Sequence, residues 1–284
     1  QGFDFPARSS IFPALIDKKQ MMSAVSLNSI LWQGSRMILP AIGGFLISIT
    51  DTSLIFFICG IGFFCMMTVL LKLEVRQDNH VNDDPWHEFK EGVKYVLQHR
   101  LFLTLILLSW ISMFFGTSYV QIMPLFAEML QSGERGFGLL ISATGVGSII
   151  GNLFISHYQQ SRKLGIMMLS SAAMAPCSLI GFSLVSWILA STAGAFWMAC
   201  CFAILTSALS SVFLVSSMTV LQIKVPDAFR GRVMGIHSIT FSMISLGGLA
   251  AGALAAQFSA PVAVVIGAFV VLSSVTWVVF KVSE

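Results

Sequence analysis

One arginine inside an apolar segment is the residue whose chemistry is clearest. Arg36 lies about a dozen residues into Ala24–Ile49, a segment with no other charged side chain. A cation within a bilayer is costly, so such a side chain is expected to face a water-filled cavity or an ionic partner. Arg36 would then attract an anionic ligand or pair with a carboxylate that moves. The alternative is that its long side chain only reaches the cytoplasmic interface.

A second group of charged residues precedes the last but one apolar segment. Asp227 and Arg230 are spaced so that they could pair. Together with Gly231 and Arg232, this pair could hold the loop in one of two conformations. The alternative is that the basic residues only set the orientation of the chain in a membrane. His237, five residues after Arg232, is of a type that titrates near neutral pH; the alternative there is a histidine that is simply hydrogen-bonded.

Residue patterns typical of enzymes and metal sites do not occur in the sequence. The five cysteines lie in apolar segments without C-x-x-C or Cys/His spacing, so neither a zinc site nor a disulfide framework is indicated. An enzyme with an intramembrane active site would need a nucleophile–base pair or a metal cluster, and His237 has a partner of neither kind. We therefore predict that the protein is not an enzyme and binds no metal or cofactor.

Long uncharged runs separated by basic clusters define the architecture. The chain is 56% hydrophobic and 10% charged, whereas soluble domains are about 25% charged. The uncharged runs each fit one or two membrane spans of about 20 residues. All but two of the sixteen lysines and arginines fall on one side of these spans, which the positive-inside rule places in the cytoplasm. The net charge of +3 is spread over these loops and does not indicate binding to nucleic acid.

The expected fold class is an all-α polytopic membrane protein with about eight complete spans. Two spans precede a long polar stretch and six follow it: Ala24–Ile49, Leu54–Leu73, Leu101–Leu125, Phe137–His157, Leu164–Leu184, Trp187–Phe213, Val233–Gln257 and Pro261–Phe280. The uncharged run that begins at Leu164 is too long for one crossing. We therefore place a turn near Ser186.

The polar stretch 74–100 predicts a cytoplasmic linker that contains one helix. Asp84 suits the N-cap of this helix, and Pro85 suits its first position. Apolar residues then recur at helical spacing: Trp86, Phe89, Val93 and Val96. We expect an amphipathic helix that lies on the cytoplasmic surface of the membrane.

Three motifs give the chain a resemblance to a known family. They are Phe5-Pro6-Ala7-Arg8 followed by Phe12-Pro13-Ala14-Leu15, Arg36-x-x-x-Pro40-x-x-Gly43-Gly44, and Pro226-Asp227-x-x-Arg230-Gly231-Arg232-Val233. With these motifs the chain resembles the major facilitator superfamily, in particular the branch that contains the enterobactin exporter and the macrolide efflux pumps. The likeness covers the whole chain, from the end of transmembrane helix 4 to helix 12.

The resemblance implies a fold of two six-helix halves. Residues 1–73 would be the end of helix 4 plus helices 5 and 6 of the N-terminal half. Residues 74–100 would be the cytoplasmic linker, and 101–284 the C-terminal half with helices 7 to 12. We expect helices 1 to 3 and most of helix 4 to precede Gln1 in the full protein.

The resemblance also implies secondary active transport. The expected protein exports a small molecule across the bacterial cytoplasmic membrane by alternating access, driven by the proton gradient and without a cofactor. A siderophore is the first expectation for the substrate, and drug or macrolide efflux by proton antiport is the alternative. A further interpretation is a truncated membrane protein that does not transport. The expected partners are the substrate and the lipid bilayer, with no nucleic acid, in a monomer whose basic loops and C-terminus are cytoplasmic.

The family architecture places a substrate pathway along helices 1, 4, 7 and 10. Beside Arg36, the pathway residues that it suggests are aromatic or hydrogen-bonding: Trp110, Phe114, Tyr119, Gln121, Trp197, Ser207 and Ser211, with Thr206 beside them. Aromatic faces and hydroxyls would suit a large aromatic ligand such as a catecholate. Pro40, Gly43 and Gly44 match the end of the family's antiporter motif, in which small residues allow close helix approach and proline bends the helix. A generic packing kink is the alternative for this motif, because Leu39 stands where the family usually has glycine.

Overall fold

Helices form every regular element of the described chain. The computed structural model describes residues 52–72, 85–158, 164–192 and 194–283, together with Leu31 and Ser35, and no strand occurs among them. Seven helices in these ranges are long and apolar enough to cross a membrane. The all-α polytopic class is therefore confirmed. The remaining predicted span, Ala24–Ile49, which is the first along the chain, falls almost entirely outside the described residues.

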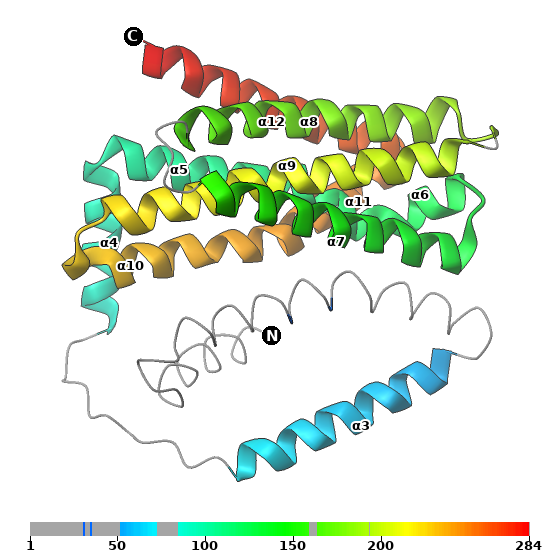
Figure 1. The fold of residues 1–284 in the computed structure, drawn as a ribbon, viewed down its shortest axis with the longest axis horizontal. Coiled ribbons are helices and arrows are strands. Elements are labelled where there is room, and N and C mark those ends of the chain that lie inside the picture. The colour runs from blue at the N-terminus through cyan, green and yellow to red at the C-terminus, as the bar shows by residue number, and fades with distance from the viewer. Residues whose placement is uncertain are drawn as a thin grey trace.

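The first described span is α3, Thr52–Leu71, close to the predicted Leu54–Leu73. Its described side chains are exposed or half-exposed along the whole helix. Figure 1 shows α3 apart from the bundle that the later helices form. Such an apolar surface suits contact with lipid, because the backbone polar groups of the helix are bonded within it.

A short helix, α4 (Pro85–Gln98), precedes a bundle of six spans. The elements of the bundle are α5 (Arg100–Ile111), η1 (Ser112–Thr117), η2 (Ser118–Ile122), α6 (Met123–Met129), α7 (Gly133–Tyr158), α8 (Leu164–Ile188), α9 (Ala195–Lys224), α10 (Asp227–Ser238), η3 (Ile239–Phe241), α11 (Ser242–Gln257) and α12 (Ala260–Ser283). The elements from α5 to α6 form one span, and those from α10 to α11 form another. The six predicted crossings after the linker are therefore present in the predicted order.

The predicted turn near Ser186 is wrong in position. Helix α8 continues through Ser186 to Ile188, because the Ser186 hydroxyl donates to the carbonyl of Phe182 at 2.9 Å and is satisfied within the helix. The chain turns after Leu189, whose carbonyl accepts from both the backbone and the side chain of Thr192. As a result α9 begins at Ala195 and continues to Lys224, whereas the prediction was Trp187–Phe213. A serine alone is a weak helix breaker in a membrane span.

The span from α5 to α6 is interrupted at its centre. A π-helical turn, Ser112–Thr117, and a 3₁₀ turn, Ser118–Ile122, replace regular α-helix there. Gly116 adds backbone freedom within the π turn, and Pro124 lies in the first turn of α6, where its missing N–H does no harm. π-Helical turns are rare and are frequently found at functional sites.

Glycines let the helices of the bundle approach to backbone contact. A Cβ atom at Gly147 or Gly151 of α7 would meet the carbonyl oxygens of Ile204 and Ala208 in α9. Gly247 of α11 likewise lies against the carbonyl oxygen of Phe114 in the π turn. Small residues at such positions are the usual means of close packing between helices in membranes, where no hydrophobic force drives association.

The linker helix α4 is attached to the bundle by its packing against α10. Figure 1 shows α4 across one end of the bundle, beside α10 and α5. The Glu91 carboxylate and the Arg232 guanidinium are 2.6 Å apart. The rings of Tyr95 and Phe229 stack with centroids 4.3 Å apart, and Val96 is only 4% exposed.

The amphipathic helix predicted in the linker is therefore confirmed as a helix, but α10 and α5 cover much of the face that was expected to rest on lipid. Gly92 makes this approach possible, because a Cβ atom there would lie 2.9 Å from the Cβ of Arg232. The predicted apolar residue Phe89, nearer the start of α4, remains 42% exposed.

We predict that Gly147→Ala destabilises the bundle, because the added methyl group collides with the carbonyl oxygen of Ile204. Overpacking of this kind typically costs about 1–3 kcal/mol. Thermal unfolding of the detergent-solubilised protein should report a lower midpoint. Gly252→Ala in α11 is the matched control, because nothing lies within 4 Å of its Cβ position; alanine there should leave the midpoint unchanged or raise it. Equal effects of the two variants would contradict the close approach.

We also predict that Arg232→Glu loosens α4, because it replaces the attraction to Glu91 by repulsion. The two side chains are 26% and 43% exposed, so the pair contributes no more than about 1 kcal/mol. Hydrogen exchange of the α4 amides should accelerate in this variant and in Glu91→Arg.

The double variant Glu91→Arg/Arg232→Glu should recover most of the protection of α4. Lys94→Glu, on the exposed side of α4, serves as a control for the change in charge. Exchange in the double variant as fast as in either single variant would show that the ion pair does not hold the helix.

Candidate functional site

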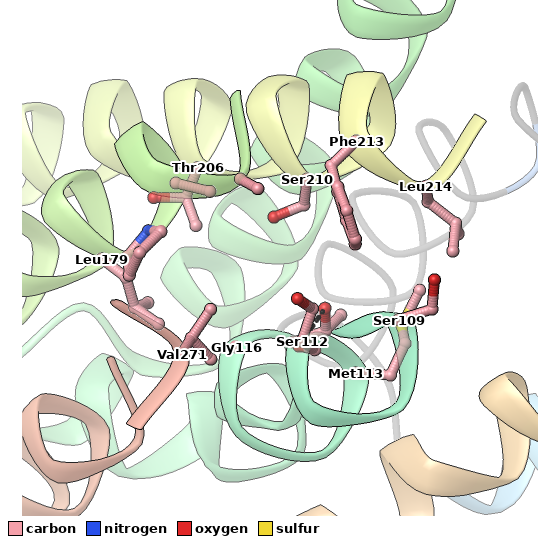
Figure 2. Close-up of a pocket in the computed structure, with 14 residues that line it drawn as sticks. Ser109, Ser112, Met113, Gly116, Leu179, Thr206, Ser210, Phe213, Leu214 and Val271 are labelled. Atoms are coloured by element: carbon pink, nitrogen blue, oxygen red, sulfur yellow. Dashed lines mark hydrogen bonds between the residues drawn. The ribbon is translucent and has the colours of Figure 1, made fainter. Parts of the chain in front are cut away.

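A narrow pocket opens between the interrupted span and α9 (Figure 2). The wall contributed by α5 and η1 consists of Ser109, Ser112, Met113, Gly116 and Thr117. The wall contributed by α9 consists of Thr206, Ser210, Phe213 and Leu214. Residues of α8 and α12, among them Ala172, Pro176, Leu179 and Val271, complete the lining. The pocket thus involves four spans of the bundle.

The pocket lies halfway along each of the spans that form it. Ser210 is at the middle of α9 (Ala195–Lys224), and Pro176 is at the middle of α8 (Leu164–Ile188). It also separates two hydrophobic clusters of the bundle, because Leu179 belongs to one cluster while Phe213 and Val271 belong to the other. In a membrane this position corresponds to the midplane of the bilayer, where transporters bind their substrates.

Three of the hydroxyls in the pocket are already engaged by the protein. Thr117 donates to the carbonyl of Ser112 within η1 at 3.5 Å. Ser109 and Ser217 share a hydrogen bond of 3.2 Å between their hydroxyl oxygens. Thr206 donates to the hydroxyl of Ser178 at 2.9 Å, and Ser178 donates onward to the carbonyl of Phe202. These bonds connect α5 and α8 to α9. They fix the walls of the pocket.

Two other hydroxyls remain available. Ser112 and Ser210 form no side-chain hydrogen bond with any residue that the structure describes. Figure 2 shows Ser210 on α9 and Ser112 on η1, on opposite sides of the hollow. Each hydroxyl can donate one hydrogen bond and accept others. The pocket therefore presents two unsatisfied polar groups across an apolar space.

Proline removes one backbone hydrogen bond of α8 beside the pocket. Pro176 lies inside α8 and has no N–H, so the carbonyl of Ala172 lacks its usual helical partner. Both residues line the pocket. None of the residues that line it is charged. The described site can thus form hydrogen bonds but offers no counter-ion.

None of the four helix 7 residues predicted for the substrate pathway lines this pocket. Trp110 packs with the hydrophobic cluster near α4, and its buried indole N–H has no partner among the described residues. Phe114 and Tyr119 line a second, smaller hollow between the interrupted span, α11 and α12. Tyr119 is 3% exposed and its ring lies 5.6 Å from that of Phe182. Gln121 is exposed and contacts α11 at Gly248.

The helix 10 residues divide in a different way. Thr206 lines the pocket, whereas Ser207 and Ser211 are half-buried and do not. Trp197 lies near the start of α9 with 65% of its surface exposed, beside Phe196. The structure therefore places Trp197 apart from the other predicted pathway residues.

The charged motifs lie elsewhere in the protein. Arg230 donates to the carbonyl of Val225 at 3.3 Å, and Arg232 pairs with Glu91 of the linker helix. Gly231 is exposed on α10, and Asp227 begins that helix with a side chain outside the described part. The predicted Asp227–Arg230 pair thus stays untested.

His237 is 2% exposed within α10, and its Nδ1 lies 3.4 Å from the Thr240 hydroxyl. This contact accords with the hydrogen-bonded alternative and leaves a role in protonation open. Arg36, Pro40, Gly43 and Gly44 lie outside the described residues. Within the described ranges, no group of three metal-binding side chains comes together.

The predicted residues did not include Ser109, Ser112 and Ser210, which line the pocket, although the sequence holds a signal for them. Ser109, Ser112 and Gly116 recur at helical spacing, as do Thr206 and Ser210, so each set forms one stripe of small or hydroxyl residues. Pro176 marks the facing helix. The prediction followed aromatic residues instead, and these pack in the core or face outward.

Comparison with known proteins agrees with this architecture. The family model described as "transmembrane secretion effector", within the major facilitator superfamily, matches residues 2–284. No solved structure matches the chain significantly.

Among curated proteins the chain is similar to enterobactin exporters named EntS. It is 27% identical over 248 residues to those of Escherichia coli O1:K1 and Shigella boydii serotype 18, and 26% identical to that of Escherichia coli O139:H28. Each alignment covers 84% of this chain and 57% of the relative, so the chain spans little more than half the length of these proteins. Because the family model matches almost every residue, the chain belongs to the transmembrane secretion effector family of the major facilitator superfamily.

Proposed function

We propose that this protein is a secondary active transporter that exports a small molecule across the bacterial cytoplasmic membrane by alternating access. One structural observation carries the proposal. A pocket at the midplane adjoins a span whose helix is interrupted by a π turn, Ser112–Thr117. Interrupted helices beside a midplane site are a recurring feature of secondary transporters. The same observation favours a transporter over an enzyme, since the pocket holds hydroxyls but no nucleophile–base pair.

The interruption provides a physical route to movement. Regular α-helix resists bending because each backbone N–H is bonded to a carbonyl one turn earlier. In the π turn this regular pattern is broken, and the backbone at Phe114 is in direct contact with Gly247 of α11. Bending at this point would change the distance between Ser112 and Ser210. Alternating access would then alter the pocket itself.

The proposed substrate is a siderophore. This assignment rests on the relatives, which are named enterobactin exporters. Drug or macrolide efflux by proton antiport is the second candidate, because the sequence motifs resemble that branch as well.

We propose the proton gradient as the driving force. The described spans carry no aspartate or glutamate near their centres. His237 is the histidine within these ranges that lies inside a span rather than at its end. It is therefore the protonation site that we propose for the described half.

The first test is siderophore in the culture medium, measured by mass spectrometry in cells with and without the intact full-length gene. We expect the deletion to lower extracellular siderophore and to raise its intracellular amount, because synthesis continues while export stops. Restoring the gene should reverse both changes. Unchanged siderophore in the medium would remove this substrate and direct the search to drugs and macrolides.

The second test concerns Arg36. We predict that Arg36→Ala in the full-length protein abolishes export while membrane insertion remains intact, because the charge is needed in a cavity or a pair. Export is measured as above, and insertion by the amount of protein in the membrane fraction. Arg36→Lys is the matched control and should retain part of the export. Normal export by Arg36→Ala would mean that the side chain only reaches the interface.

A further inference from the structure

We propose that the midplane pocket binds an uncharged hydrogen-bonding group of the substrate, such as an amide or a hydroxyl, carried on an apolar framework. That this group belongs to a transported substrate rests on the function proposed above. The preference for an uncharged group is a property of the described residues alone.

The two available hydroxyls define where this group would bind. Ser112 and Ser210 stand on opposite walls and are not engaged by other described residues (Figure 2). Ser109 and Thr206, by contrast, are held by Ser217 and Ser178. A ligand group between Ser112 and Ser210 could therefore form bonds that the protein does not form for itself.

The polar groups of the lining can both donate and accept. Each of the two serine hydroxyls supplies one O–H donor and can also accept hydrogen bonds. An amide carries one acceptor and up to two donors, and a hydroxyl carries both functions. Either group would satisfy the lining in full. A purely apolar group would leave these polar atoms without partners, which is unfavourable in a low-dielectric site.

A charged group would lack compensation in the same place. None of the lining residues carries a charge. The described cations nearest in sequence to the pocket walls, Arg100, Lys224 and Lys281, lie at the ends of their spans. A carboxylate or an ammonium moved from water into this site would lose hydration without gaining an ion pair. The pocket should therefore discriminate by charge as well as by shape.

The rest of the lining fits an apolar framework around that group. Met113, Leu179, Phe213 and Val271 surround the hydroxyls with apolar surface. The pocket also extends to α8 and α12, beyond helices 7 and 10 along which the pathway was expected. An anionic substrate could still be exported, provided that its charge lies outside this pocket and its amide or hydroxyl lies inside.

Three compounds that differ only in the charge of one group can test the proposal. Benzamide, benzoate and benzamidine share the same ring and carry a neutral, an anionic and a cationic group respectively. Their binding to the purified chain in phospholipid nanodiscs is measured by saturation-transfer NMR, with empty nanodiscs to subtract partition into lipid. We expect benzamide to bind and the two ions to show no signal that depends on the pocket.

The serine hydroxyls supply the matched variants. Ser112→Ala/Ser210→Ala should weaken benzamide binding about tenfold, because two hydrogen bonds of ordinary strength are lost. Ser170→Ala/Ser273→Ala removes two hydroxyls on the exposed faces of α8 and α12 and should leave binding unchanged. Gly116→Leu, which fills the pocket, should abolish it.

Two results would overturn the proposal. One is benzoate or benzamidine binding as strongly as benzamide and with the same dependence on Ser112 and Ser210. The other is benzamide binding that neither the serine pair nor Gly116→Leu affects. Export is tested separately in cells, so serine-dependent benzamide binding with unchanged siderophore in the medium would uphold the pocket and reject siderophore export. The reverse result would uphold export and reject the pocket.

Discussion

The structure depends above all on the need to satisfy backbone polar groups inside a bilayer. Each unbonded N–H or C=O in hydrocarbon is costly, so a span must be a helix, and irregular backbone is tolerated only where protein or water surrounds it. Two features that disturb regular helix border the midplane pocket: the π turn at Ser112–Thr117 and the proline at position 176. A third, the 3₁₀ turn Ile239–Phe241, lies within the α10–α11 span.

Close helix packing at glycines holds the π turn and the walls of the pocket in position. Gly247 of α11 contacts the carbonyl of Phe114, and a Cβ atom at Gly267 of α12 would lie 2.8 Å from the carbonyl oxygen of Phe115. The π turn is therefore supported by two neighbouring helices. On the other side of the bundle, Gly147 and Gly151 bring α7 against α9, which carries Ser210. The walls of the pocket are positioned by backbone contacts, so a shift of α11 or α12 would be transmitted directly to the interrupted span.

The order of the membrane spans could be predicted from the sequence more readily than the location of the pocket. Uncharged runs and basic clusters identified the order of the spans, because hydrophobic length and loop charge are properties of composition. The turn after α8 was misplaced because serine is compatible with a membrane helix when its hydroxyl bonds to a carbonyl of the previous turn, as Ser186 does.

The pocket was not predicted, for a geometric reason. Neighbouring residues on a helix differ in direction by about 100°, so Trp110 faces the core while Ser109 lines the pocket. Only the packing of the other spans determines which of the two lines the pocket.

The contact between α4 and α10 also changes how movement of the linker should be understood. A helix that rested on lipid alone could follow either half of a transporter. Here the Glu91–Arg232 ion pair and the Tyr95–Phe229 stack join α4 to the start of the α10–α11 span. These contacts attach α4 to this span rather than leave it on the membrane surface alone. The motif around Arg232, which the sequence placed in a loop, lies instead in helix α10 and contacts the linker helix through Arg232 and Phe229.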